Sequence, residues 1–177
     1  MEGKGGAVFP GLTALSKIMD QRLIQGDGVM VIFVCVKLKE IFQKQREYAW
    51  PRPDLCPRCG QSRLWGHGFV PAYFDGFAGQ IHLRRYRCPE CHCVIRLRPR
   101  GYFSRIQASI ETIHLSLKRG IQQGKYLAGL PRSRQRHWLK ALVRNTVAYF
   151  GNAWKGRLLE AFDRLIVMGK VPVSSSV

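Results

Sequence analysis

Two Cys-x-x-Cys pairs constrain this chain more than any other feature of its sequence. The first, Cys56-Pro-Arg-Cys59, is followed by Gly60, and the second is Cys88-Pro-Glu-Cys91. Four thiolates in two short turns are the ligand set of a tetrahedral structural Zn²⁺ ion, because each turn places two sulfurs about 2.3 Å from one shared metal. We therefore expect one structural zinc ion bound by Cys56, Cys59, Cys88 and Cys91.

Other uses of the cysteines have less support. Residues 1–10 contain no apolar core of a secretory signal peptide, so nothing indicates an oxidising compartment in which disulfides form. A thioredoxin-type motif would open a helix after a strand, whereas both pairs adjoin prolines and strand-like sequence. A rubredoxin-like iron site and a redox pair stay as alternatives to zinc. Cys93 is a spare thiol beside the second pair, and Cys35 is expected to be a small buried side chain.

Residues 54–103 have the pattern of a zinc ribbon. Residues 63–74 are predicted to be extended, glycines within 75–79 favour a reversal, and residues 80–87 return to the second pair. This hairpin is longer than usual, since such sites commonly separate their halves by about 15 to 20 residues. A third strand over 94–98 alternates apolar residues with arginines. Three arginines of the ribbon are expected to contact phosphates: Arg84, Arg96 and Arg98.

The net charge indicates a polyanionic partner. It is +18 for 177 residues, and Lys and Arg exceed Asp and Glu by 2 over residues 1–50, by 6 over 51–103 and by 10 over 104–177. Such an excess is typical of proteins that bind nucleic acid, and an anionic membrane surface is the competing interpretation. Membrane insertion is not expected, because the longest apolar run, residues 29–36, is far shorter than the about twenty residues of a spanning helix.

The first 53 residues are predicted to be an N-terminal extension. Residues 1–28 are weakly patterned, and Met30 offers an alternative start of translation. Residues 29–36 read either as a buried strand or as the start of a helix, because periodicity does not decide for a short apolar run. Apolar side chains at helical spacing favour a helix over residues 37–50, which Pro51 ends.

Residues 104–168 are predicted to be all-α. Apolar spacing favours a helix over 106–118 that Gly120 ends, a short helix over 121–127, a third from beyond Pro131 to about Phe150, and a last helix over 154–168. The Ser-rich residues 169–177 are predicted to be a disordered tail. The core-facing stripe expected on the third helix comprises Leu139, Leu142, Val143, Thr146, Val147 and Phe150.

The third helix also carries a row of cations. Arg132, Arg136, Lys140 and Arg144 follow at intervals of four, so they share one side of the helix. Two helices, a Gly-containing turn and a basic helix are the ingredients of a helix-turn-helix, whose last helix enters the major groove. A cationic helix on an ordinary bundle is the alternative. Base edges would be read by Arg132, Ser133, Arg134, Arg136 and His137, and phosphates would be contacted by Lys140 and Arg144.

Three segments together resemble a known family. They are Cys56-Pro-Arg-Cys59-Gly60, then Arg84-Arg85-Tyr86-Arg87 leading into the second cysteine pair, and Arg136-His137-Trp138-Leu139. Because of these three segments, residues 54 to about 142 resemble the zinc-ribbon proteins associated with bacterial insertion sequences, a transposase-like family of unknown function. The chain departs from that pattern at His92-Cys93, where such ribbons more often continue with glycine and a basic residue. The resemblance implies a DNA-associated role in mobile-element biology.

A catalytic role is not expected. Strand-transfer enzymes need three carboxylates that converge on two metal ions within a domain of well over a hundred residues, and the 11 acidic residues here are scattered. The sequence also lacks a Gly-rich phosphate loop and a nucleophile with a partnered base.

The sequence therefore predicts an α+β protein. It would have a small antiparallel-β zinc ribbon, followed by an all-α helix-turn-helix region and preceded by a helical N-terminal extension. Its expected function is non-catalytic binding of double-stranded DNA in the cytoplasm, in association with the nucleoid and with a transposase or other protein of the same element. Two other classes stay open: a protein-interaction adaptor for a recombinase or polymerase, and a basic RNA-binding protein.

Overall fold

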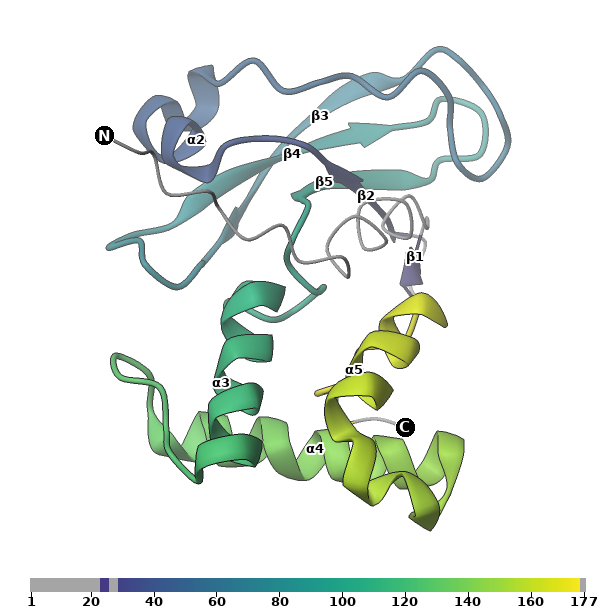
Figure 1. The fold of residues 1–177 in the computed structure, drawn as a ribbon. Helices are drawn as coiled ribbons and strands as arrows, with labels where there is room; N and C mark the ends of the chain where they lie inside the picture. Colours follow the sequence, from purple (N-terminus) through teal and green to yellow (C-terminus); the bar gives the residue numbers. More distant parts are fainter. Residues whose placement is uncertain (1–22, 26–28, 176–177) are drawn as a thin grey trace, which may run out of the picture. The chain divides into compact units, whose positions relative to one another are not determined.

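The computed structural model describes residues 23–25 and 29–175 (Figure 1). Residues 1–22 and 26–28 of the weakly patterned N-terminal segment lie outside this described part, as do the last two residues of the predicted tail. Met30, the alternative start of translation, lies inside it. The described chain divides into two compact units: the sheet unit, which ends at Thr112, and the helical unit, which begins at Ile113. The sheet unit extends past residue 103, the predicted end of the ribbon, because the following loop bonds back to it: the Ile110 N–H donates to the Gly101 carbonyl.

The sheet unit contains a five-stranded mixed sheet in its described residues, with the order β1-β2-β5-β4-β3. Only β2 and β5 are parallel; the other neighbours are antiparallel. The protein is therefore α+β, and the strands expected over residues 63–74, 80–87 and 94–98 are confirmed. The elements are β1 (Leu23–Gln25), β2 (Val29–Val34), α2 (Leu38–Lys44), the 3-10 turn η1 (Gln45–Glu47), β3 (Trp65–Ala72), β4 (Ile81–Arg87) and β5 (Val94–Pro99).

β2 corrects the predicted N-terminal extension. Residues 29–34 form a strand, and this strand lies parallel to β5 with Val29 opposite Val94. The segment is thus part of the sheet whose strands flank the cysteine knuckles rather than a separate extension. The following helix is shorter than the predicted 37–50, because Gln45 adopts a positive φ of 49° and ends α2.

Gln45 also holds α2 against the sheet. Its Nε2 donates to the Phe42 carbonyl at 2.8 Å and to the Gln80 carbonyl at 3.2 Å, and its Oε1 lies 2.7 Å from Nδ1 of His82 in β4. The sheet face beneath α2 is apolar, since Tyr86 and Ile95 are directly opposed across β4 and β5 and both are buried. This side of the unit holds its hydrophobic core, with Met30, Ile41, Tyr86, Ile95 and Leu97.

The helical unit consists of three α-helices and one 3-10 segment in its described residues. They are α3 (Ile110–Gln123), which starts at the end of the sheet unit, α4 (Arg132–Phe150), η2 (Asn152–Arg157) and α5 (Leu158–Val167). α3 and α5 both pack against α4 (Figure 1). None of the helices in the described chain combines the length and the apolar character needed to cross a membrane. The buried apolar side chains include Leu117, Trp138, Leu142, Phe162 and Leu165.

The connection between α3 and α4 differs from the predicted helix-turn-helix. α3 starts later than the predicted 106–118 helix and runs through Gly120, and the chain leaves the helix at Gly124, whose φ is +64°. The short helix expected over 121–127 does not form. Residues 124–131 instead make a loop longer than the three to four residues of a typical helix-turn-helix. Buried Gln135 fixes this loop, because its side chain bonds both the N–H and the carbonyl of Leu127.

The C-terminal tail is ordered as far as Ser175, which corrects the expected disorder over residues 169–175. Val173 is 2% exposed. Nδ2 of the buried Asn145 donates to the Pro172 carbonyl at 2.8 Å and to the Ser174 carbonyl at 3.2 Å. The tail therefore packs on α4, because Pro172 and Val173 supply apolar surface that the serine-rich composition obscures.

Candidate metal centre and cationic surfaces

The two cysteine knuckles have similar backbone conformations. In the first, the Gly60 N–H donates to the Cys56 carbonyl at 2.9 Å, and Gly60 has a φ of +78°. In the second, the residue after the last cysteine is His92, which takes a φ of +55°. Left-handed backbone is unusual for a residue with a side chain, so His92 adopts the conformation that glycine provides in the first knuckle. The departure from the family pattern at residue 92 therefore does not alter the turn.

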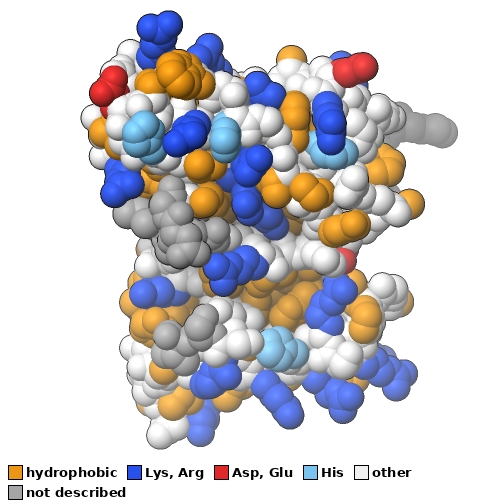
Figure 2. Space-filling view, turned by 180° about the vertical axis from the view of Figure 1, so that it is seen from behind, with side chains coloured by type: hydrophobic (Ala, Val, Ile, Leu, Met, Phe, Trp, Pro, Cys, Tyr) orange, Lys and Arg blue, Asp and Glu red, His pale blue; other side chains and the backbone are white. Residues whose placement is uncertain are grey.

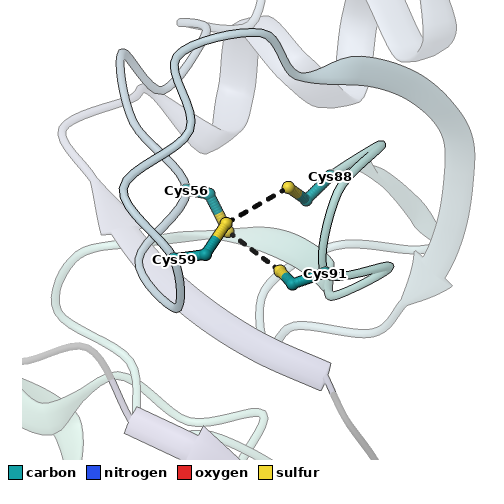
Figure 3. Close-up of side chains that lie close together, drawn as sticks. All are labelled: Cys56, Cys59, Cys88 and Cys91. Atoms are coloured by element: carbon teal, nitrogen blue, oxygen red, sulfur yellow. Dashed lines mark hydrogen bonds between the residues drawn. The ribbon is translucent and has the colours of Figure 1, made fainter.

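The four predicted ligands meet at one point. The knuckle before β3 and the knuckle between β4 and β5 direct their sulfurs toward one another (Figure 3), and all four sulfurs lie within 4.8 Å of one another. The Sγ atoms of Cys56 and Cys91 are 3.6 Å apart, and those of Cys59 and Cys88 are 3.5 Å apart. A tetrahedral zinc ion with 2.3 Å bonds holds its sulfurs about 3.8 Å apart, so the cluster fits one Zn²⁺ ion. Disulfides are about 2.05 Å long, and all six cysteines are free.

The thiols perturb one another strongly. Desolvation raises the pKa of Cys56, but hydrogen bonds from the backbone N–H groups of Cys59 and Arg58 outweigh it and lower this pKa to about 7. The Gln61 N–H lowers the pKa of Cys59, yet desolvation and the other three cysteines raise it to about 12. Thiolates this close repel each other, so a divalent cation is what allows them to be ionised together.

The two other cysteines do not join the cluster. Cys93 is 1% exposed; its carbonyl accepts the Cys88 N–H at 3.0 Å and its Sγ lies 3.7 Å from the Val94 carbonyl. It therefore supports the second knuckle through its backbone and packs as a buried thiol. Cys35 is exposed, contrary to expectation, because it follows the last residue of β2 and no longer belongs to the sheet.

The three ribbon arginines do not form one surface. Arg84 lies on the α2 side of the sheet, with its guanidinium 4.8 Å from the centre of the Phe69 ring. Arg96 and Arg98 lie on the opposite side. Arg98 is only 8% exposed, and its Nη2 donates to the Ile106 carbonyl at 2.9 Å. Direct phosphate contact by Arg98 is thus excluded in this conformation, because the loop after β5 covers it.

The cationic row on α4 is exposed along its whole length. Arg132, Arg136, Lys140 and Arg144 are all exposed, as are Ser133 and His137 of the predicted reading residues, whereas Arg134 is half-buried. Figure 2 shows that Lys and Arg side chains predominate over Asp and Glu on the visible face of the molecule. The buried face is shifted from the predicted stripe, of which only Leu142 and Thr146 are buried. Polar Gln135, Asn145 and Thr146 belong to the buried face because the loop before α4 and the tail cover it; the buried residues of α4 are Gln135, Trp138, Ala141, Leu142, Asn145 and Thr146.

The cations of α4 differ in their contacts. Arg136 and Lys140 make no hydrogen bond or ion pair within the described part of the chain. Arg144 donates to the Ser174 carbonyl at 2.8 Å, and Nε2 of His137 lies 3.2 Å from Oγ of Ser175. The tail therefore engages two predicted DNA contacts, and Arg136 and Lys140 stay available.

Comparisons with protein-family models, with curated proteins and with solved structures gave no match.

Proposed function

We propose that this protein binds double-stranded DNA through α4, with a zinc ribbon in the sheet unit as its structural support. The observation that carries the proposal is the exposed row of Arg132, Arg136, Lys140 and Arg144 on a helix whose other side is buried. α4 has five basic residues and no acidic residue, so nothing on the helix itself neutralises the row. A fixed line of cations matches the fixed line of phosphates on a duplex.

The dimensions of α4 suit the major groove. Its 19 residues span about 28 Å, and a groove about 12 Å wide admits one α-helix. In the proposed arrangement the N-terminal turns, with Arg132, Ser133, Arg136 and His137, lie at the base edges. Lys140 then lies against a phosphate, and Arg144 does so through the guanidinium N–H groups that the Ser174 carbonyl does not accept; both contacts set the register of the helix.

The metal has a structural role in this proposal. Cys56, Cys59, Cys88 and Cys91 would hold one Zn²⁺ ion, which when bound links the two knuckles and supplies no reaction. By linking the two knuckles, metal binding would add its free energy to the folding of the sheet unit. The sequence resemblance to insertion-sequence proteins supports a non-catalytic role at mobile-element DNA, with the element's own transposase as the protein partner.

Salt-dependent binding to duplex DNA tests the proposal. Arg136→Ala and Lys140→Ala each remove one unpartnered cation from α4, and each is expected to weaken binding and to reduce the salt slope by about one. Lys155→Ala, which removes one exposed cation from η2, is the matched control and should leave the affinity nearly unchanged. Equal affinities for all three variants and the original protein contradict a role for α4.

Two further measurements separate related functions. Selection of bound sequences from a random duplex pool should give a preferred site, and Arg136→Ala should relax it, since base contacts carry specificity. Competition with structured RNA at the same salt should not displace the duplex. Stronger competition by RNA than by duplex DNA would replace this proposal with RNA binding.

A further inference from the structure

Three arginines lie together on the sheet face opposite α2. Arg85 of β4 is directly opposed to Arg96 of β5, so both side chains are on the same face. Arg98 follows two positions after Arg96 in β5 and shares that face. Like charges directly opposed across an antiparallel pair destabilise a sheet. Nothing in the metal site or in α4 explains why the fold keeps this arrangement.

The cluster has unmet hydrogen-bonding and charge requirements. The Nε atoms of Arg85, Arg96 and Arg98 are inaccessible to solvent and have no hydrogen-bond partner in the described chain. Desolvation and then the charge of Arg85 lower the pKa of Arg96, and burial followed by the charge of Arg96 lowers the pKa of Arg98 to about 10. No carboxylate pairs with Arg85 or Arg96 within the described residues. Partly desolvated cations without counter-charges are unfavourable, and so are buried N–H groups without acceptors, so an anion at this place would stabilise the fold.

Arg85 lies beside an irregular stretch of β3 and is accessible from solvent. The register of β3 with β4 is shifted between Gly66 and Phe69, and Gly68 in this bulge has a φ of +71°. A Cβ at Gly68 would lie 4.0 Å from Nη2 of Arg85, at ordinary van der Waals distance, so this part of β3 runs beside the guanidinium without crowding it. Arg85 and Arg96 are half-exposed and can be reached from solvent, whereas Arg98 is held behind them by the Ile106 carbonyl and by the Phe74 ring at 5.1 Å.

We propose that Arg85 and Arg96 together bind a phosphate group, and that buried Arg98 adds to the positive potential without touching it. Two adjacent guanidiniums offer paired N–H donors with the geometry that phosphate oxygens accept, and hydrogen bonds between ionised partners are the strong ones. The group is either a backbone phosphate of a nucleic acid or the phosphate of a small ligand. The site lies in the sheet unit and does not depend on α4, so either proposal can fail while the other stands.

The test is an NMR titration of the zinc-loaded full chain that follows the Nε–H signals of arginine. Inorganic phosphate is added, with sodium chloride at the same ionic strength as the reference. We expect saturable shifts of the Arg85 and Arg96 signals with phosphate only. Arg96→Gln should weaken phosphate binding at least tenfold, whereas Arg46→Gln, which removes an exposed arginine of η1 near the α2 side, should not change it.

The outcomes are distinct. Shifts that are linear and equal in phosphate and chloride overturn the proposal, as does unchanged phosphate affinity in a folded Arg96→Gln variant. If that variant does not fold, Arg85→Lys is the second variant. It keeps the positive charge but removes the paired N–H donors of the guanidinium, so it should still weaken phosphate binding. Addition of a short DNA duplex then identifies where the bound phosphate group comes from. If the duplex shifts the Arg85 and Arg96 signals and added phosphate reverses these shifts, the group is a backbone phosphate of DNA. If only inorganic phosphate shifts these signals to saturation, the group belongs to a small phosphorylated ligand.

Discussion

Replacement of one predicted zinc ligand, Cys88→Ser, should remove much of the stability of the sheet unit. Structural zinc sites in small peptides contribute about 10 to 16 kcal/mol of binding free energy, which for four similar ligands is about 2.5 to 4 kcal/mol each. Cys88 is 0% exposed, so water cannot easily replace the lost sulfur. We therefore expect zinc affinity to fall by roughly 10² to 10³-fold and the metal-dependent fold of the sheet unit to weaken accordingly.

The assay compares Cys88→Ser with Cys93→Ser, a matched change at a buried thiol outside the cluster. Metal content by mass spectrometry and Co²⁺ titration, followed through thiolate-to-cobalt absorption, report binding directly. Thermal unfolding with and without a chelator reports the coupling to the fold. Cys93→Ser should retain one metal per chain and lose only packing energy, about 1 kcal/mol, because its backbone contact with Cys88 is unchanged.

Two results would refute this reasoning. If Cys93→Ser abolishes the cobalt–thiolate absorption while Cys88→Ser keeps it, the ligand set is wrong. If a chelator removes all metal and the unfolding of the sheet unit does not change, the metal is not the structural link between the knuckles.

Three further outcomes are expected. Zinc binding at pH 7 should release protons and strengthen as the pH rises, because the raised pKa values of Cys59 and Cys91 keep these thiols protonated until the metal binds. Calorimetry in buffers of different ionisation enthalpy measures the proton release, and a zinc affinity that does not depend on pH would contradict the prediction. His92→Gly should raise the free energy of unfolding of the metal-loaded protein by about 0.5 to 1 kcal/mol, since glycine adopts the observed φ of +55° without strain. A melting temperature below that of the original protein would count against the backbone conformation described for the second knuckle. Asn145→Ala should destabilise the helical unit by about 1 to 3 kcal/mol and increase proteolysis of the tail, because the Pro172 carbonyl loses its donor and the Ser174 carbonyl keeps Arg144. Unchanged protease resistance would show that Val173 and Arg144 hold the tail without Asn145.

The cysteine cluster could be predicted because its signal is local. Each Cys-x-x-Cys turn fixes two sulfurs through its own backbone hydrogen bonds, so only the meeting of the two knuckles depends on the rest of the fold. The hairpin between them was equally accessible, since strand alternation and turn glycines are short-range features. His92 shows the limit of this reasoning: its positive φ could not be read from its residue type.

The pairing of β2 with β5 could not be predicted from a pattern. The apolar residues 29–34 suit a buried strand or a helix equally, and the decision is made by β5, which offers a parallel partner far along the chain. The arrangement of the arginines depended on the same register. Arg85 was not recognised as a site residue because its importance comes only from its position opposite Arg96.

The helical unit shows how polar residues can mislead. Gln135 and Asn145 interrupt the apolar stripe of α4, yet both are buried because their amides bond the loop before α4 and the tail after α5. A periodicity argument treats such residues as surface positions, so it rotated the buried face of α4 away from its true position. The four cations of the α4 row are exposed as predicted, because charged side chains stay in solvent unless they are paired in the interior.

The parallel pairing of β2 and β5 has a consequence for synthesis on the ribosome. β2 is translated first, but the edge of β2 that pairs with β5 stays uncovered until Val94, the partner of Val29, has been synthesised. At about 5 to 20 residues per second, the uncharged segment Val29–Val34 stays without that partner for roughly 3 to 13 seconds. Exposed apolar edges associate with each other. The second cysteine knuckle leaves the ribosome just before β5, so the proposed metal site can be completed only shortly before β2 gains its parallel partner.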